Sequence, residues 1–573
     1  MITEFQQRPY DQKAFQTLHD AGMLRPLAQA LAARGVTSPE DLREDWKALL
    51  PPSMLEGTEE AAHLLADLRE NHGRAVIVAD YDCDGATACA VAMRGLSDLG
   101  IATSYVVPDR FKLGYGLSPK IVDFCANSQP RPDLIITVDN GIASVDGVAH
   151  AKALGLKVLI TDHHLPAETL PAADCIVNPN LKTSQFPSKT LAGCGVMYYV
   201  LLALRAELRR RGVFTPATQP RLDALADIVA LGTVADVVKL DKNNRILVSQ
   251  GLTRIRRGLA HPGLAALFAA AGRDWAKATA RDFAFAIAPR INAAGRLSEM
   301  SVGINCLLAD SAASAQSCAL QLENLNHERR DLEDTMQNDA AEYVAQLDWR
   351  SKATVTLYDG SWHQGVVGLV ASRVKERIHR PVIAFANDSD QCNSDGTPTF
   401  LKGSGRSIEG VHLRDALDAV SKLDPEIIER FGGHAMAAGL TIRPENLRRF
   451  SSLFEFCVAR MVDPAVFNRL VKVDGALSPD EISFALVEAI SSRIWGQGFE
   501  PPLFANDFTI VNQRVLKDAH LKLYLDLSGV RFDAIFFRHN TPLPTHVRLA
   551  YRPEINEFQG RRTIQLIVEA AEI

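Results

Sequence analysis

The chain has 573 residues, with 62 Lys and Arg against 68 Asp and Glu, and its formal net charge is −6. Hydrophobic residues make up 47% and charged residues 23%, an ordinary globular composition that excludes a mostly disordered chain. No apolar run approaches the roughly 18 residues that span a bilayer, and the polar N-terminus is unlike a signal or transit peptide, so membrane and secreted classes are excluded.

A length of this order predicts about three to five domains. Nine cysteines are scattered along the chain without a CxxC pair. Such an unpatterned, odd-numbered set predicts reduced thiols and a cytoplasmic protein. The acidic total does not exclude a nucleic-acid partner, because a basic channel can lie within an acidic protein.

Short apolar runs alternate with helical stretches between residue 75 and about residue 165. Four runs of strand length each end in Asp: AVIVAD (75–80), SYVVPD (104–109), LIITVD (134–139) and KVLITD (157–162). Helical spacing falls between them, at 85–98, 120–126 and 144–154. This order predicts a parallel sheet covered on both faces. Ligands bind such sheets beyond the carboxyl ends of the strands, where these aspartates fall.

The rest of the chain predicts further elements in order. Helices are expected at about 191–210 and 221–231, and a long one near 312–347. A second α/β region follows, with strand TVTLYD, a helix over 366–378 and strand PVIAFA, before a polar surface loop at 387–398. After about residue 470, short alternating strands such as LKLYLDL and RTIQLIVEA are typical of a small barrel.

The first predicted strand runs into three alternating carboxylates, Asp80, Asp82 and Asp84. Residues two apart on an extended segment face the same way, so the three can converge and would then need protons or a cation. An EF-hand is excluded, because Val91 stands where the loop's closing Glu belongs and a strand precedes the motif. Helix capping by one of the three is the alternative interpretation.

Further candidate ligands occur later in the chain, two of the groups directly after predicted strands. Asp139 lies in TVDNG, His163 and His164 follow Asp162, and Asp236 lies among apolar residues in LGTVADVV. Carboxylates with imidazole and no thiolate suit Mn²⁺ or Mg²⁺. Five or six such ligands exceed the needs of one ion and predict two metals that activate water against a phosphoryl group.

In this order DYDCDG, VDNG, TDHH and TVADVV resemble the four signature motifs of the DHH phosphoesterase superfamily. Five further strings narrow the resemblance to its bacterial single-strand-specific exonucleases: AGCGV (192–196), PRINAAGR (289–296), WHQGVVG (362–368), KGSGRS (402–407) and FGGHAMAAG (431–439). The similarity extends from about residue 20 to the end of the chain.

The resemblance implies roles at the matching positions of the motifs. The metal ligands would be Asp82, Asp84, Asp139, His163 and Asp236, with Asp139 bridging both ions. Asp80 would lie beside them as an outer or weaker ligand, and His164 would contact the scissile phosphate. In FGGHAMAAG, Gly432 and Gly433 would admit a phosphate to the backbone, with His434 against it.

Ser404 and Arg406, with Arg110, Arg290 and Arg296, would hold phosphates near the 5′ end, because the Arg fork binds phosphate oxygens bidentately. Two alternatives stay open: Arg290 and Arg296 can instead form structural ion pairs, and KGSGRS can be an ordinary turn. Lys112-Leu113 stands where relatives carry an acidic residue, so no role is assigned to either.

The expected fold class is α/β, with a parallel-sheet DHH domain, a second α/β DHH-associated domain joined by a long helix, and a C-terminal OB-fold-like β-barrel. The expected boundaries are an N-terminal helical segment (1–50), the DHH domain (51–240), a helical connector (241–348), the DHH-associated domain (349–470) and the OB-fold-like domain (471–573).

The expected function is removal of 5′-mononucleotides from single-stranded DNA in the 5′→3′ direction with two Mn²⁺ or Mg²⁺ ions. The resemblance also suggests a monomer whose partners include a RecQ-type helicase and a single-strand-binding protein. Two rival functions are a DHH phosphodiesterase on short oligonucleotides or cyclic dinucleotides, and a non-catalytic replication scaffold. The residues that follow the GGH motif argue against the first, because those enzymes are shorter, and the full set of ligands argues against the second.

Overall fold

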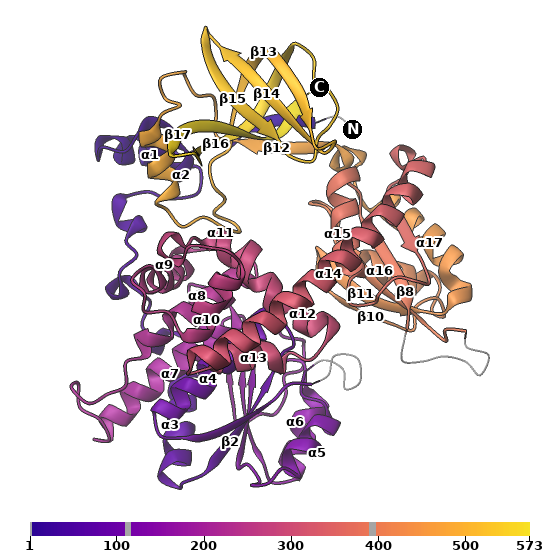
Figure 1. The fold of residues 1–573 in the computed structure, drawn as a ribbon. Coiled ribbons are helices and arrows are strands. Elements are labelled where there is room, and N and C mark those ends of the chain that lie inside the picture. Colours follow the sequence, from indigo (N-terminus) through magenta and orange to yellow (C-terminus); the bar gives the residue numbers. More distant parts are fainter. Residues whose placement is uncertain (1–2, 109–115, 389–396, 573) are drawn as a thin grey trace. The chain divides into compact units, whose positions relative to one another are not determined.

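The computed structural model describes residues 3–108, 116–388 and 397–572 (Figure 1). It consists of two compact units. The first comprises Glu40–Glu328 with Ile494–Glu500, and the second comprises Met1–Pro39, Arg329–Arg493 and Pro501–Ile573. No helix in the described ranges is long and apolar enough to cross a bilayer, and each cysteine within them is a free thiol.

The sheet of the first unit has the strand order β3-β2-β4-β5-β6, and every pair in it is parallel. Its strands are β2 (Arg74–Ala79), β3 (Ala102–Val106), β4 (Leu134–Val138), β5 (Lys157–Thr161) and β6 (Cys175–Val177). The first four were predicted, and β6 was not. Ala79 pairs with Val138, which in turn pairs with Thr161, so β2, β4 and β5 end at one level.

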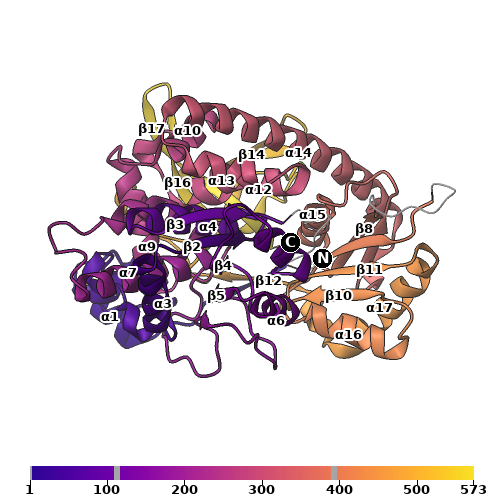
Figure 2. The same cartoon turned by 90° about the horizontal axis from the view of Figure 1, so that it is seen from below.

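Helices cover both faces of this sheet, as the apolar strands predict. Alternate strand residues such as Val78 and Ile135 pack with Ile121 of α5 and Val148 of α6, while α4 and α7 contact the sheet from its other face. Figure 2 shows α4 and α6 on opposite sides of the strands. These helices are α3 (Thr58–Glu70), α4 (Cys83–Asp98), α5 (Pro119–Ala126), α6 (Val145–Ala153) and α7 (Gly193–Arg210).

A helical layer completes the first unit. The predicted helix at 221–231 is a short 3-10 turn, Leu222–Leu225, followed by α8 (Ala226–Ala235). The other helices of this unit are α9 (Lys242–Arg256), α10 (Pro262–Ala270), α11 (Ala280–Asp282), a π-helical turn (Phe283–Ile287), α12 (Ala288–Leu297) and α13 (Ser301–Leu308). Helix α14 (Ala312–Gln346) begins in this unit and ends in the second, because the boundary between the units falls between Glu328 and Arg329. The long predicted helix is confirmed as α14, which is continuous over 35 residues (Figure 2).

The second unit contains a sheet of order β10-β11-β9-β8-β7, parallel between β7 and β8 and antiparallel elsewhere. Its elements are β7 (Val355–Tyr358), α15 (Val367–Ile378), β8 (Val382–Asn387), β9 (Leu401–Arg406), α16 (Leu413–Leu423), β10 (Arg430–Gly433), β11 (Ala437–Ile442) and α17 (Leu447–Met461). Phe385, Phe450 and Phe454 are fully buried between the sheet and the helices α16 and α17.

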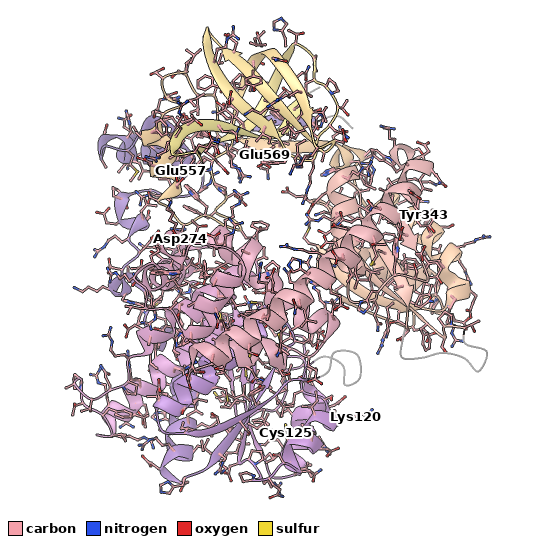
Figure 3. The ribbon with its side chains drawn as sticks, in the orientation of Figure 1. Lys120, Cys125, Asp274, Tyr343, Glu557 and Glu569 are labelled. Carbon is pink, nitrogen blue, oxygen red and sulfur yellow. The ribbon has the colours of Figure 1, made fainter. Side chains whose placement is uncertain are left out.

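The C-terminal region is a closed barrel of order β13-β14-β15-β17-β16, as the alternating strands and the resemblance predict. Its strands are β13 (Phe504–Leu516), β14 (His520–Leu527), β15 (Val530–Phe536), β16 (His546–Phe558) and β17 (Arg561–Glu572). Glu569 of β17, labelled in Figure 3, pairs with Arg552 of β16. Strand β13, which was not predicted from the sequence, pairs with both β14 and β16 and so closes the barrel.

The first 39 residues belong to the second unit and are not wholly helical. Strand β1 (Thr3–Gln7) pairs in parallel with β12 (Arg469–Val473), and helices α1 (Gln12–Asp20) and α2 (Arg25–Ala32) follow. Helix α18 (Phe484–Ser491) contacts α2. Arg34 and Asp474 form a buried ion pair at 2.7 Å, and the N–H of Phe5 donates to Glu572 at 3.0 Å. The barrel therefore supports the N-terminal segment.

Candidate metal centre

The candidate ligands gather at the carboxyl ends of β2, β4 and β5. Asp80, Asp139 and Asp162 directly follow strands that end at one level. Among the described residues, three groups hold ligand atoms within 4.8 Å of one another: Asp80 with Asp82 and Asp139, Asp84 with His163 and Asp236, and Asp139 with His163 and His164. The five predicted ligands, with Asp80 and His164, therefore lie in one cluster.

The loop after β2 carries three of these carboxylates. Asp82 is the N-cap of α4 and accepts the N–H of Gly85 at 3.0 Å, so the capping interpretation holds for this residue alongside its place in the cluster. Asp84 is fully buried and accepts the N–H groups of Gly193 at 2.6 Å and Cys194 at 3.0 Å. These donors form the N-terminus of α7, where the helix dipole favours a negative charge.

Asp139 lies at the centre of the cluster in a strained backbone conformation, with φ at 61°. A Cβ atom at Gly193 would lie 2.6 Å from Cβ of Asp139, so only glycine permits this approach of α7. In the described residues Oδ1 of Asp139 accepts no hydrogen bond, although Nε2 of His163 lies 3.0 Å away. Nε2 of His163 also lies 3.5 Å from Oδ2 of Asp236, at the C-terminus of α8.

The carboxylates of the cluster repel one another in a buried setting. Burial, reinforced by the neighbouring carboxylates, raises the pKa of Asp82, Asp139 and Asp236, and it raises the pKa of Asp80 to about 8. A divalent cation would neutralise this charge. Because the donors are carboxylate oxygens and imidazole nitrogens, the residues fit Mn²⁺ or Mg²⁺.

Asp162 lies in the TDHH motif, and the sequence analysis assigned it no role, but the structure places it in direct contact with the candidate ligands' loop. It is buried and accepts four hydrogen bonds, from the N–H groups of Ile142, His163 and His164 and from Nδ1 of His164 at 2.7 Å. Burial would raise the pKa of Asp162, but the His164 bond holds it below its ordinary value. Burial would lower the pKa of His164, but Asp162 raises it to about 9.

Asparagine side chains fix the same loops, and their importance was likewise not predicted. Asn140 donates to the carbonyls of Val78 and Val138 and so connects β2 with β4. Asn178 and Asn180 donate to the carbonyls of His164 and His163. Asn292 of α12 accepts the N–H of Cys83 at 2.8 Å. Asn140 and Asn292 lie in the VDNG and PRINAAGR motifs, which could have drawn attention to them, whereas Asn178 and Asn180 lie in no motif named above.

The arginines of the first unit that were predicted to contact phosphates differ from one another in burial and in their partners. Arg290 of α12 is buried and paired with Glu323 of α14, which corresponds to the alternative of a structural ion pair. Arg296 lies half-buried in the last turn of α12. Arg110, Lys112 and Leu113 lie outside the described residues.

KGSGRS lies on β9, the middle strand of the second unit's sheet, and is therefore not a turn. Gly403 and Gly405 face the buried side, while Ser404 and Arg406 are partly exposed. A guanidinium nitrogen of Arg406 donates to Oγ of Ser404 at 3.1 Å. At Gly368 of α15, a Cβ atom would lie 2.8 Å from Oγ of Ser404, so this glycine leaves room for the pair.

The two glycines before His434 have different surroundings. Nothing lies within 4 Å of a Cβ atom at Gly432, which faces open space. Gly433 has φ at +143°, and a Cβ atom there would lie 2.4 Å from the carbonyl oxygen of Ala437. The exposed His434 donates its N–H to that same carbonyl at 2.8 Å and closes the turn into β11. Gly432 is therefore free to admit a ligand, whereas Gly433 is required by the fold.

Three family models match successive parts of the chain: the DHH family N-terminal domain over residues 74–233, the DHHA1 domain over residues 351–460, and the RecJ OB domain over residues 473–570. The Escherichia coli K12 single-stranded-DNA-specific exonuclease RecJ is 45% identical over 95% of this chain and 96% of its own length. The Haemophilus influenzae protein of the same name is 45% identical over 94% of this chain and 95% of its own.

Solved structures agree with these matches. The crystal structure of RecJ in complex with Mn²⁺ from Thermus thermophilus has a TM-score of 0.82 and 30% identity, and the match covers 100% of this chain and 79% of that one. The same protein in complex with Mg²⁺ has a TM-score of 0.76. The chain belongs to the RecJ family of single-stranded-DNA-specific exonucleases.

Proposed function

We propose that this chain hydrolyses single-stranded DNA from its 5′ end, releases 5′-mononucleotides and requires two Mn²⁺ or Mg²⁺ ions. The observation that carries the proposal is the position of Asp139. Asp139 and His163 each belong to two of the three ligand groups, and Asp139 is the carboxylate of the two, so it is the residue that would be placed to contact both ions. Asp82, Asp84, His163 and Asp236 complete the proposed ligand set, with Asp80 beside it.

Bound Mn²⁺ or Mg²⁺ would supply Lewis-acid activation of the phosphodiester and of an attacking water. The residues of the chain prepare the site for this chemistry. The α7 N-terminus holds the Asp84 side chain in place through two N–H groups. Asp162 holds His164 in its protonated form, which we propose donates a charge-assisted hydrogen bond to the scissile phosphate.

The second unit would bind the 5′ end of the strand. Ser404 and Arg406 present a hydroxyl and a guanidinium on the same face of β9, and Gly439 lies opposite Ser404 in the register. Gly432 lies opposite Gly439 in turn. Backbone without side chains, at Gly439 and Gly432, therefore lies next to the Ser404–Arg406 pair. We propose that a 5′ phosphate binds there, with His434 nearby. Arg110 and Arg296 would contact other phosphates. Arg290 would support the site indirectly, by pairing α12 with Glu323 of α14.

The barrel would extend the single-strand track, as OB-folds commonly do. We further propose that the protein acts as a monomer in the cytoplasm, in DNA repair and recombination, with a RecQ-type helicase and a single-strand-binding protein as partners. We also propose the five domains that were expected from the sequence, with boundaries at residues 50, 240, 348 and 470 between successive domains.

A release assay tests the proposed function. Single-stranded, duplex and dinucleotide substrates labelled at the 5′ end are incubated with Mn²⁺, with Mg²⁺ or with EDTA. We expect metal-dependent release of labelled mononucleotide from the single strand first. Faster cleavage of the dinucleotide would favour a short-oligonucleotide phosphodiesterase. A parallel single strand labelled at the 3′ end tests the direction, and immediate release of that label as a mononucleotide would contradict 5′→3′ digestion.

A further inference from the structure

A cavity of about 360 Å³ lies in the first unit beside the metal-binding loop. It is bounded by the end of β3, by α5, which carries the Cys125 labelled in Figure 3, and by the turn between α12 and α13. Tyr81, which stands between Asp80 and Asp82, forms part of its wall. The cavity therefore adjoins the candidate ligands without containing them.

The sheet register places this cavity close to the reacting centre. Val106 of β3 pairs with Val78 of β2, so Val107 and Pro108 of the cavity wall follow β3 at the level where Asp80 follows β2. Neighbouring strands lie about 4.8 Å apart. The cavity thus begins about one strand spacing from the first carboxylate of the cluster.

The lining of the cavity favours a flat, uncharged ring over a phosphate. Aromatic walls come from Tyr81, Tyr105 and Phe124, with Met300 and two valines between them. The described lining residues include no Lys or Arg, and the charged one is Glu299, which would repel a phosphate. The volume lies within the range of about 300–1,000 Å³ that is typical of small-ligand sites, which likewise combine apolar walls with few polar groups.

Phe124 is the residue most open to an incoming ring. Its side chain is 62% exposed, whereas Ile121, Val122 and Cys125 on the same helix are fully buried. A ring stacked on Phe124 would cover apolar surface that the fold leaves in water. Stacking of this kind tolerates every base, because each base has a π-face.

We propose that this cavity receives the nucleobase of the nucleotide whose phosphate lies at the metal centre. The inference rests on the proposed exonuclease function and adds a contact to the base. Phe124 is then a positioning surface that orients the terminal nucleotide for hydrolysis. Ser298, Ser301 and Glu299 offer hydrogen-bonding groups at the rim, and the aromatic walls supply most of the binding.

The test compares wild type, Phe124→Ala and the control Phe456→Ala, whose side chain is 48% exposed on α17 of the second unit. Substrates are 5′-phosphorylated single strands whose 5′-terminal nucleotide carries either a base or an abasic sugar. We expect wild type and the control to prefer the base by about tenfold in kcat/KM, and Phe124→Ala to show a preference below about twofold.

A binding measurement without turnover accompanies the kinetics. A strand with 5′-terminal 2-aminopurine is titrated with each protein in EDTA, and we expect fluorescence quenching by wild type and Phe456→Ala and weaker quenching by Phe124→Ala. An unchanged base preference or unchanged quenching in Phe124→Ala would overturn the inference, as would equal cleavage of both strands by wild type. Failure of wild type to degrade either strand would instead overturn the proposed function, and quenching would still test the cavity.

Discussion

Nδ1 of His164 lies 2.7 Å from Oδ1 of the buried Asp162, and the same oxygen accepts the N–H groups of His163 and His164. One carboxylate therefore fixes both the backbone after β5 and the orientation of the second imidazole. Groups that orient ligands in this way are typical of metal sites. Asp162 thus acts through His164, without belonging to any of the three ligand groups.

The variant Asp162→Asn should lower kcat by about 10- to 100-fold, because the side chain loses the charge that holds His164 protonated and oriented. KM should change less than kcat, since the proposed 5′-phosphate contacts of Ser404 and Arg406 stay intact. Asp123→Asn is the matched control, because Asp123 pairs with His150 at 2.7 Å on the exposed faces of helices α5 and α6. Steady-state kinetics on 5′-phosphorylated single strands make the comparison, and equal losses in both variants would contradict the assignment.

The variant Asp139→Asn should lose most activity, because the proposed bridging ligand loses its charge and both ions lose position together. In EDTA the variant should be at least as stable as wild type, since it removes a buried carboxyl that is costly to ionise. Asn also tolerates the left-handed backbone at this position.

Thermal unfolding with and without Mn²⁺ measures the metal effect separately from activity. Wild type should gain melting temperature on metal binding, by mass action, and Asp139→Asn should gain much less. A folded variant that digests single-stranded DNA within a few-fold of wild type, with the full Mn²⁺ stabilisation, would refute the bridging role.

The variant Arg406→Ala should raise KM more than it lowers kcat, because a grip of equal strength in ground and transition states affects mainly binding. The preference for a 5′-phosphate over a 5′-hydroxyl should fall by about tenfold or more. Arg443→Ala serves as the control, because Arg443 is an exposed arginine of the same unit that pairs with Glu429. Loss of kcat at unchanged KM would argue against a 5′-phosphate grip.

Alanine at the two adjacent glycines of β10 should have opposite effects. Gly433→Ala should destabilise the protein by about 1–3 kcal/mol or more, because φ is +143° and the new Cβ would meet the carbonyl of Ala437. Gly432→Ala should leave the melting temperature unchanged and raise KM, since its Cβ would occupy only the open space offered to the substrate. Calorimetry and kinetics on the pair distinguish the two roles.

The aromatic residues of the barrel divide into core and surface. Tyr551 is fully buried against Phe508, and its hydroxyl donates to Asn506 at 2.8 Å, so it does not stack on bases. Phe537 is 50% exposed and lies edge-on to His520 at 5.3 Å. Phe536 is stacked on His539 at 4.4 Å, while the side chain of Phe558 lies outside the described set.

We therefore expect Phe537→Ala to weaken binding of long single strands by about fivefold or more and to leave turnover of very short oligonucleotides unchanged, because base stacking is worth roughly 1–3 kcal/mol. Fluorescence anisotropy at several salt concentrations measures the binding. A deletion from residue 475 would be a poorer test, because it also removes Glu572 and the strands that support residues 1–39. Equal losses on short and long strands would contradict a role confined to binding.

Local sequence patterns were sufficient to predict four of the five strands of the first unit's sheet and the edge where the candidate ligands lie. Continuous apolar runs of strand length that alternate with helical stretches favour parallel strands buried on both faces, and carboxylates at the ends of those strands then lie at one edge. The positions of Asp80 and Asp139 after β2 and β4 follow from this local pattern, and so do the long helix α14 and most of the barrel.

Tertiary structure alone decided the elements whose residues have no strong preference of their own. KGSGRS contains two glycines and is compatible with a turn, yet it becomes the central strand β9 because β8 and β11 supply hydrogen bonds on both sides. In the same way β1 forms because β12, which is distant in sequence, offers an edge. The contacts of Asp162 and Arg290 depend on partners that folding brings close, His164 and Glu323, since a charged group in a buried setting requires a partner.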